Sequence, residues 1–210
     1  MKTSKSSFVT KILSISSLLT LIMLIAACKT LPPKEEIKEP IIISRSLTAR
    51  GLLSAQELAV FFLNNNSQED PAHILQFAQY YIDEAAAENI NSDIAFAQMC
   101  HETGFLRFGG LVQAEWHNYC GLGAISKEQT GYQFETEELG VRAHIQHLQA
   151  YATTEDIPLN KELVDPRYNW VHKTKFARTL GDMARFWAAD PEYAHKLEKM
   201  LERMEESVNK

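Results

Sequence analysis

The residue whose setting most favours chemistry is Glu102, which follows the apolar segment 94–101. This segment is apolar on nearly every face of a helix, as expected of a buried helix, and Gly104 is a natural helix stop. Glu102 would then lie where a buried helix reaches the surface. Apolar neighbours and the negative end of the helix dipole favour its protonated form. A protonated glutamate in a cleft can serve as a general acid, whereas a solvated one at a helix end has no role.

Three further glutamates, Glu135, Glu137 and Glu138, occur in one short segment. A second carboxylate paired with Glu102 would form the acid pair of a glycosidase. The simpler interpretation is a charged helix start, where acidic side chains favour the helix dipole. Aromatic residues that follow Glu102 fit sugar stacking and core packing equally well: Phe105, Phe108, Trp116 and Tyr119.

Histidines and cysteines suggest other chemistry only weakly. His144 and His147 are three residues apart, a spacing that metal ligands use, but no third ligand has a defined place, so structural histidines are favoured. Cys100 and Cys120 could form a disulfide or remain buried free thiols. Cys100 lies mid-helix in apolar surroundings, where a high thiol pKa disfavours a nucleophile. We expect neither a metal nor a cofactor.

The elements that must position these residues are mainly helical. Hydrophobic periodicity and capping patterns predict helices over 54–63, 72–88, 93–102, 137–151, 174–188 and 191–204, and a short strand over 132–134. Ser54 and Glu57 have the capping-box spacing, and Asp93 could cap the helix that ends at Glu102. A glycine- and aromatic-rich loop follows that helix.

The start of the chain has the pattern of an export signal. Three lysines precede an apolar run over 12–25, which ends in Ile-Ala-Ala before Cys28. These small residues resemble a bacterial lipobox, which would make Cys28 the lipidated N-terminus; a plain signal peptide or an N-terminal membrane anchor are the alternatives. We expect a signal peptide over 1–27, a lipidated N-terminus and flexible tether over 28–51, and one domain over 52–205.

Charge limits the partners of the exported domain. The whole chain has a formal net charge of −6, and removal of residues 1–27 takes away three lysines and no acid, which leaves −9. Nucleic-acid binding requires clustered Lys and Arg, so it is disfavoured. We expect a monomer in the cell envelope, held to a membrane by the lipid on Cys28 and exposed outside the cytoplasm.

Several blocks of the sequence resemble one family. The segments 94–108, 118–124, 140–151, 165–167 and 187–193 are similar, in this order, to motifs of the bacterial endo-β-N-acetylglucosaminidases of the mannosyl-glycoprotein type, glycoside hydrolase family 73. We expect the resemblance to extend over about residues 52–200, essentially the whole mature domain. The resemblance implies a lysozyme-like α+β fold, mainly helical, with a short β-hairpin lobe beside the catalytic helix.

The resemblance also implies an activity and site residues. The family hydrolyses the β-1,4 bond between N-acetylglucosamine and N-acetylmuramic acid in peptidoglycan. Glu102 falls on its general acid and Tyr193 on a tyrosine that faces the cleft. The residues expected to contact the glycan strand are Phe105, Asn118, Tyr119 and Gly121.

One position departs from the family pattern. Leu139 occupies the place where the family often has a second glutamate, with Glu137 and Glu138 just before it. Either Glu138 is the second acid, or the substrate's own acetamido group acts as nucleophile. A lytic transglycosylase on the same kind of fold and a non-catalytic peptidoglycan-binding lipoprotein are the rival interpretations.

Overall fold

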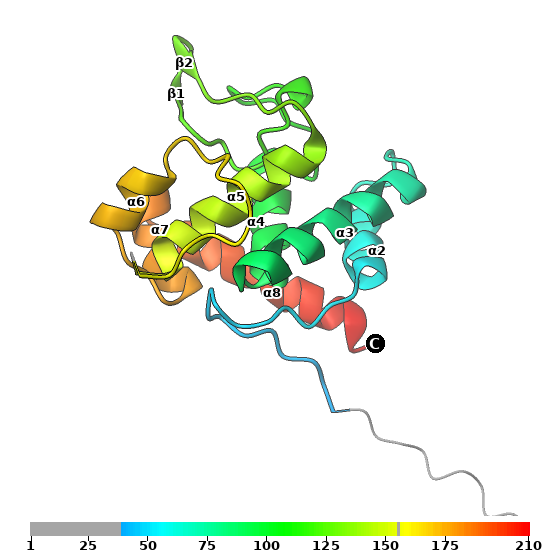
Figure 1. Ribbon diagram of the computed structural model, residues 1–210. Helices are drawn as coiled ribbons and strands as arrows, with labels where there is room; N and C mark the ends of the chain where they lie inside the picture. Colours follow the sequence, from blue (N-terminus) through cyan, green and yellow to red (C-terminus); the bar gives the residue numbers. More distant parts are fainter. Residues whose placement is uncertain (1–38, 155) are drawn as a thin grey trace, which may run out of the picture. The chain divides into compact units, whose positions relative to one another are not determined.

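The computed structural model describes residues 39–154 and 156–210 (Figure 1). The leader and Cys28 lie outside these residues. The described elements are α2 (Ala55–Asn65), α3 (Pro71–Glu88), α4 (Ser92–Thr103), the 3-10 turn η1 (Ala114–Trp116), β1 (Ala124–Ser126), β2 (Gln129–Thr130), α5 (Glu137–Ala152), α6 (Tyr168–Thr174), α7 (Leu180–Trp187) and α8 (Tyr193–Val208). Seven helices and one small antiparallel sheet confirm the expected lysozyme-like α+β class for the described residues. None of these helices is both long and apolar enough to cross a bilayer.

Helix α4 is the central element of the fold. Its residues from Ser92 to Cys100 are all buried, and it packs against α2, α3, α5 and α8 (Figure 1). Asn91, and not Asp93, caps its start, because the Asn91 side chain accepts the backbone N–H groups of Asp93 and Ile94 at 3.0 and 3.4 Å. The Asp93 carboxylate instead accepts the N–H of Leu52 at 2.7 Å. The buried helix that the sequence predicts is therefore present, with a different cap.

The sequence predicts well those helices whose hydrophobic pattern repeats over several turns. Ser54 and Glu57 form the expected capping box at the start of α2. Helices α2, α3 and α5 begin and end within two residues of the predicted ranges. Thr136 caps α5 by accepting the N–H of Leu139 at 3.2 Å, a position that satisfies a helix-terminal donor.

The segment 40–51 is part of the compact unit and not of a tether. Ile43 and Leu47 are 1% and 0% exposed and belong to the main core. Arg45 pairs with Glu198 of α8, near the other end of the chain. The domain therefore starts earlier than the expected boundary at residue 52, because α8 supplies both apolar and ionic partners for this segment.

The hairpin precedes the predicted strand, 132–134, in the sequence and does not include it. β1 and β2 pair antiparallel over residues 124–130. Segment 132–134 is not a strand: Tyr132 donates its N–H to the Leu122 carbonyl and Phe134 donates to the Trp116 carbonyl, both at 2.9 Å. Its backbone bonds thus go to two different parts of the preceding loop, and no single partner strand forms.

The C-terminal third contains one helix that was not predicted. The expected helix over 174–188 starts only at Leu180, where the Thr179 hydroxyl accepts the N–H of Asp182 at 3.2 Å. The preceding α6 has 7 residues, too few for a hydrophobic period to show. Helix α8 was predicted, and it begins at Tyr193, two residues after Pro191.

Candidate active site

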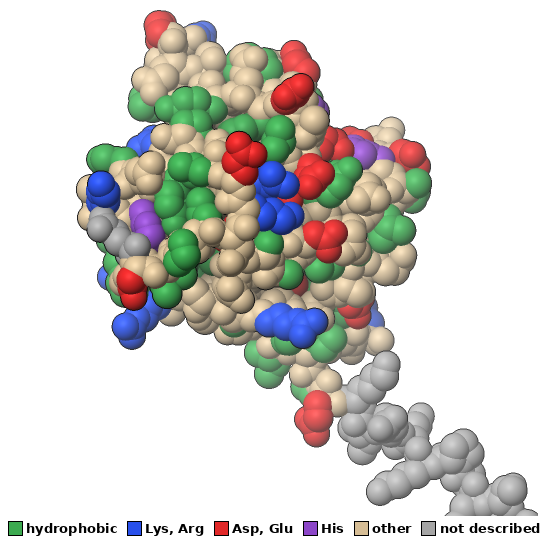
Figure 2. Space-filling view, viewed as in Figure 1, with side chains coloured by type: hydrophobic (Ala, Val, Ile, Leu, Met, Phe, Trp, Pro, Cys, Tyr) green, Lys and Arg blue, Asp and Glu red, His purple; other side chains and the backbone are tan. Residues whose placement is uncertain are grey.

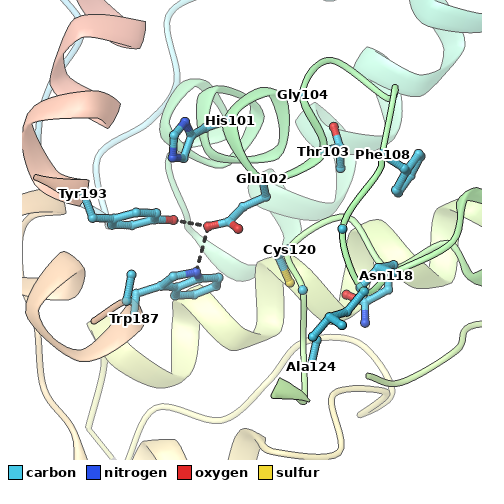
Figure 3. Close-up of a pocket in the computed structure, with 15 residues that line it drawn as sticks. His101, Glu102, Thr103, Gly104, Phe108, Asn118, Cys120, Ala124, Trp187 and Tyr193 are labelled. Atoms are coloured by element: carbon cyan, nitrogen blue, oxygen red, sulfur yellow. Dashed lines mark hydrogen bonds between the residues drawn. The ribbon is translucent and has the colours of Figure 1, made fainter. Parts of the chain in front are cut away.

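Glu102 lies in the last turn of α4, in the wall of a cleft of about 470 Å³ (Figure 3). Gly104 ends the helix with a φ of +60°, a conformation that glycine adopts at little cost, so the chain turns away directly after Glu102. The side chain of Glu102 is open to solvent. Residues from the last turn of α4, the loop after it, the hairpin, the end of α7 and the start of α8 complete the cleft: His101, Thr103, Phe108, Leu111, Val112, Asn118, Cys120, Gly121, Ala124, Trp187, Ala188 and Tyr193.

Two neutral donors hold the Glu102 carboxyl group. The Trp187 indole N–H donates to Oε1 of Glu102 at 3.0 Å, and the Tyr193 hydroxyl donates to the same oxygen (Figure 3). No ion pair between described residues involves Glu102. The structure thus places Tyr193, which the resemblance puts on a cleft-facing position, beside Glu102, and adds Trp187.

The environment of Glu102 favours its neutral form. The surrounding cleft walls displace water, and this desolvation raises the pKa of Glu102; the hydrogen bonds from Tyr193 and Trp187 oppose only part of that rise. A carboxyl group with a raised pKa and no cation beside it can keep its proton nearer neutral pH than an ordinary glutamate. This is the requirement for a general acid.

Trp187 was not predicted as a site residue, although the sequence has only three tryptophans. It reaches Glu102 from 85 residues away. Its ring packs at 5.2 Å from the ring of His147 and at 5.9 Å from that of Tyr151. His147 is in turn bonded through Nδ1 to Asp165 at 2.7 Å. His147 is therefore a structural histidine that supports Trp187.

Asn118 shapes the opposite wall of the cleft. Its side chain is 1% exposed and bonds to both backbone groups of Leu122, at 2.8 and 3.0 Å, and to the Tyr132 carbonyl at 2.9 Å. Helix α5 lies tightly under this loop, since a Cβ at Gly140 would stand 1.9 Å from the His117 carbonyl oxygen. Asn118 and Gly121 line the cleft as predicted. The Asn118 amide uses its hydrogen bonds to fix the backbone of the loop.

Two predicted substrate contacts lie in the core and do not line the cleft. Phe105 is 8% exposed, and its ring packs 5.6 Å from that of Phe62. Tyr119 is 3% exposed, and its ring packs 4.7 Å from that of Phe77. The aromatic residues that follow Glu102 are thus divided: these two support the loop from inside, whereas Phe108 borders the cleft.

Glu138 is also absent from the cleft lining. It pairs at 3.2 Å with Arg142, one helical turn further along α5, and Arg142 also binds Glu84 of α3. The structure therefore does not bring Glu138 together with Glu102. Among described residues that line the cleft, Glu102 is the only carboxylate.

Both cysteines of the described chain are free thiols. Cys100 is buried in α4, and Cys120 lines the cleft beside Glu102 (Figure 3). Burial raises the pKa of each thiol, and the charges of Glu102 and Asp165 raise that of Cys120 further. Neither thiol is therefore suited to act as a nucleophile. Within residues 39–154 and 156–210, no group of three or more His, Cys, Asp or Glu side chains could hold a metal ion.

Comparison with known proteins identifies the family. The Glucosaminidase model, described as mannosyl-glycoprotein endo-beta-N-acetylglucosaminidase, matches residues 78–206. The chain belongs to this family. An uncharacterized protein of Borreliella burgdorferi is 41% identical over 155 residues, which cover 74% of each chain. No solved structure matches. At family level the protein is a peptidoglycan N-acetylglucosaminidase-type hydrolase, and Glu102, Trp187 and Tyr193 all fall within the matched residues.

Proposed function

We propose that this glucosaminidase cleaves the β-1,4 bond between N-acetylglucosamine and N-acetylmuramic acid in peptidoglycan, with Glu102 as general acid. The observation that carries the proposal is the Glu102 carboxyl group, held in a cleft by two neutral donors and without a cation. Such a group can give its proton to a glycosidic oxygen and recover it from water.

In the first step, Glu102 protonates the glycosidic oxygen. The bond between C1 of N-acetylglucosamine and this oxygen breaks, and the muramic acid leaves with a free 4-hydroxyl group. The ionised Glu102 keeps the hydrogen bonds from Tyr193 and Trp187. These bonds are stronger to a carboxylate than to a neutral carboxyl group, so they stabilise the charge as it develops.

The second group is the substrate's own acetamido oxygen. This oxygen attacks C1 as the glycosidic bond breaks and forms a cyclic oxazolinium ion that keeps the amide N–H, a route used where no carboxylate nucleophile is available. Water then attacks C1 and breaks its bond to the acetamido oxygen, which restores the acetamido group, and Glu102 takes a proton from that water. Among the described residues that line the cleft, Glu102 is the only carboxylate, and Glu138 is not one of them. This supports the substrate-assisted route.

Digestion of purified sacculi tests the proposal. The wild-type protein should release fragments whose reducing ends are N-acetylglucosamine, and Glu102→Gln should release them about 10²–10⁴-fold more slowly while it still binds sacculi. Mass spectrometry of the fragments separates the rivals. Anhydro-muramic ends would assign a lytic transglycosylase, and no fragments from the wild type would leave a binding lipoprotein.

We also propose that Cys28 carries a lipid that holds the enzyme in the cell envelope. The support is the sequence Ile-Ala-Ala before Cys28, after a basic and an apolar zone. Metabolic labelling with a fatty-acid analogue should mark the wild type and not Cys28→Ala. Label on both proteins, or on neither, would contradict the assignment.

A further inference from the structure

A chain of buried hydrogen bonds leads from Glu102 into the core. Behind Tyr193, Gln98 donates from Nε2 to the Tyr193 hydroxyl at 2.8 Å. The other end of the same amide, Oε1, is 3.0 Å from Nε2 of His144, and Nδ1 of His144 is 3.1 Å from the hydroxyl of Tyr81. These four residues come from α8, α4, α5 and α3, and none is more than 4% exposed.

The direction of this chain follows from its buried end. Tyr81 is fully buried, and among the described residues its hydroxyl has one hydrogen-bond partner, His144. Burial raises the pKa of Tyr81 and lowers that of His144 to about 3, so both groups are neutral at physiological pH. If His144 donated to Tyr81, the phenol hydrogen would be buried without an acceptor, which is unfavourable. Tyr81 is therefore the donor, and Nδ1 of His144 is the acceptor.

Each later bond then has one possible direction. Because a neutral imidazole has one N–H, His144 carries its hydrogen on Nε2 and donates to Oε1 of Gln98. The Gln98 amide then donates to Tyr193. With its oxygen already accepting from Gln98, the Tyr193 hydroxyl directs its own hydrogen to Oε1 of Glu102.

Two donors thus point at Oε1 of Glu102, from Tyr193 and Trp187, whereas no hydrogen bond of a described residue reaches Oε2. A proton on Oε1 would weaken one of these bonds, and a proton on Oε2 weakens neither. On the basis of the proposed function, we infer that Gln98, His144 and Tyr81 are positioning residues, which fix Tyr193 as a donor to Oε1 and so place the catalytic proton of Glu102 on Oε2.

The chain is not a route for protons. It ends at Tyr81 in the core, and burial disfavours a charged state at His144. The other titratable groups near it include His147, whose charge would further oppose that of His144, and His101, whose ring packs 5.5 Å from Tyr193. Cys120 lies beside Glu102, and the thiols of Cys100 and Cys120 and the phenol of Tyr119 act on Tyr81. Glu102 therefore exchanges its proton through the cleft.

The tautomer of His144 tests the direction without any substrate. In ¹⁵N-edited NMR of the wild-type protein, His144 should be neutral, with Nε2 protonated and Nδ1 unprotonated, from pH 5 upward; His144→Asn assigns the signals. A hydrogen on Nδ1 would reverse the chain and overturn the inference. This measurement does not depend on activity, so it remains decisive even if the proposed function fails.

Two substitutions at Gln98 test the consequence for Glu102. In Gln98→Glu, the new carboxylate accepts from both Tyr193 and His144 and draws the Tyr193 hydrogen away from Glu102. Gln98→Leu removes the donor to Tyr193 without adding charge. Gln98→Glu should lower kcat on sacculi by about tenfold or more and move the alkaline limb of the pH profile to higher pH, because Glu102 loses a donor that favours its ionised form. In Gln98→Leu the Tyr193 hydroxyl is no longer fixed as a donor, so the same changes should appear but be smaller.

Gln149 provides the matched control. It is buried in α5, and Tyr168 donates to its Oε1 at 2.7 Å, so it also makes a buried amide–tyrosine hydrogen bond, with the direction reversed and away from the cleft. Gln149→Glu and Gln149→Leu should leave the alkaline limb in place. If the Gln98 variants lower kcat but leave that limb unchanged, their role is only structural and the inference is wrong; should they not fold, the His144 tautomer decides.

Discussion

Two glutamates in this protein have opposite electrostatic environments. Glu84 of α3 is 1% exposed, yet its pKa is lowered: burial alone would raise it, but hydrogen bonds from Arg142 and Lys161 outweigh that effect. Glu102 faces the cleft, and its pKa is raised, because desolvation by the cleft walls outweighs the hydrogen bonds from its neutral donors, Tyr193 and Trp187.

The comparison shows that the charge of the partners matters more than exposure. Arg142 binds Glu84 through two nitrogens at 3.0 Å each, and Lys161 binds it at 2.8 Å. In Figure 2, basic side chains lie between acidic ones over the region where Figure 1 shows α3 and α5. A charged glutamate with these partners links elements together, whereas a glutamate with neutral donors can exchange a proton.

The largest expected effect separates the two glutamates by activity. Glu102→Gln should lower kcat on sacculi by about 10²–10⁴-fold with the fold intact, because the proton donor is lost. Glu84→Gln should keep its activity per folded molecule, since Glu84 does not line the cleft. Digestion assays, with folded protein quantified by circular dichroism, check both. Equal losses in the two variants would contradict the division of roles.

The next effect separates them by stability. Arg142→Met leaves Glu84 buried with Lys161 alone, and should lower the free energy of unfolding by about 2–3 kcal/mol at pH 7. The pKa of Glu84 is lowered in the folded state, so its ionic stabilisation is present above its unfolded pKa and is lost as pH falls. The penalty in urea unfolding should therefore shrink toward pH 3. A penalty that does not change with pH would mean that lost packing, and not charge, is the cause.

The sequence predicted the place of Glu102 in the cleft better than its surroundings. Glu102 could be identified because its setting is local, an apolar helix followed by Gly104. Trp187 could not, because its indole reaches Glu102 only after α7 packs beside α4 and α5. Glu138 lies near the expected position of a second acid, but its ion pair with Arg142, one turn away, indicates the simpler helix-surface role.

The same distinction applies to the fold. Helices α3 and α5 have 18 and 16 residues, long enough for their periods to show in the sequence. Segment 40–51 has no repeating hydrophobic pattern, and its burial depends on α8, which lies about 150 residues away in the chain. Local patterns thus predict helices, whereas contacts between distant segments decide where the domain begins and which residues support Glu102.

A smaller effect concerns the donors to Glu102. Tyr193→Phe removes one neutral donor, so the pKa of Glu102 should rise further and the alkaline limb of the pH profile of kcat should move to higher pH. The expected loss in kcat is about tenfold. Tyr168→Phe, which removes a buried hydroxyl bonded to Gln149, is the control and should leave the limb in place. Movement of the limb to lower pH in Tyr193→Phe would contradict the donor role.

The smallest expected effect is a gain in stability from loss of the acid. The pKa of Glu102 is raised in the folded state, so folding favours its neutral form, and stability is lost as pH rises above its unfolded pKa. Glu102→Gln removes this loss and should raise Tm by about 1–2 °C at pH 7, a small value because the side chain is open to the cleft. At pH 4, where the wild-type carboxyl group is largely protonated, the two melting temperatures should agree. A lower Tm of Glu102→Gln at pH 7 would place Glu102 with Glu84, as a carboxylate whose charge stabilises the fold.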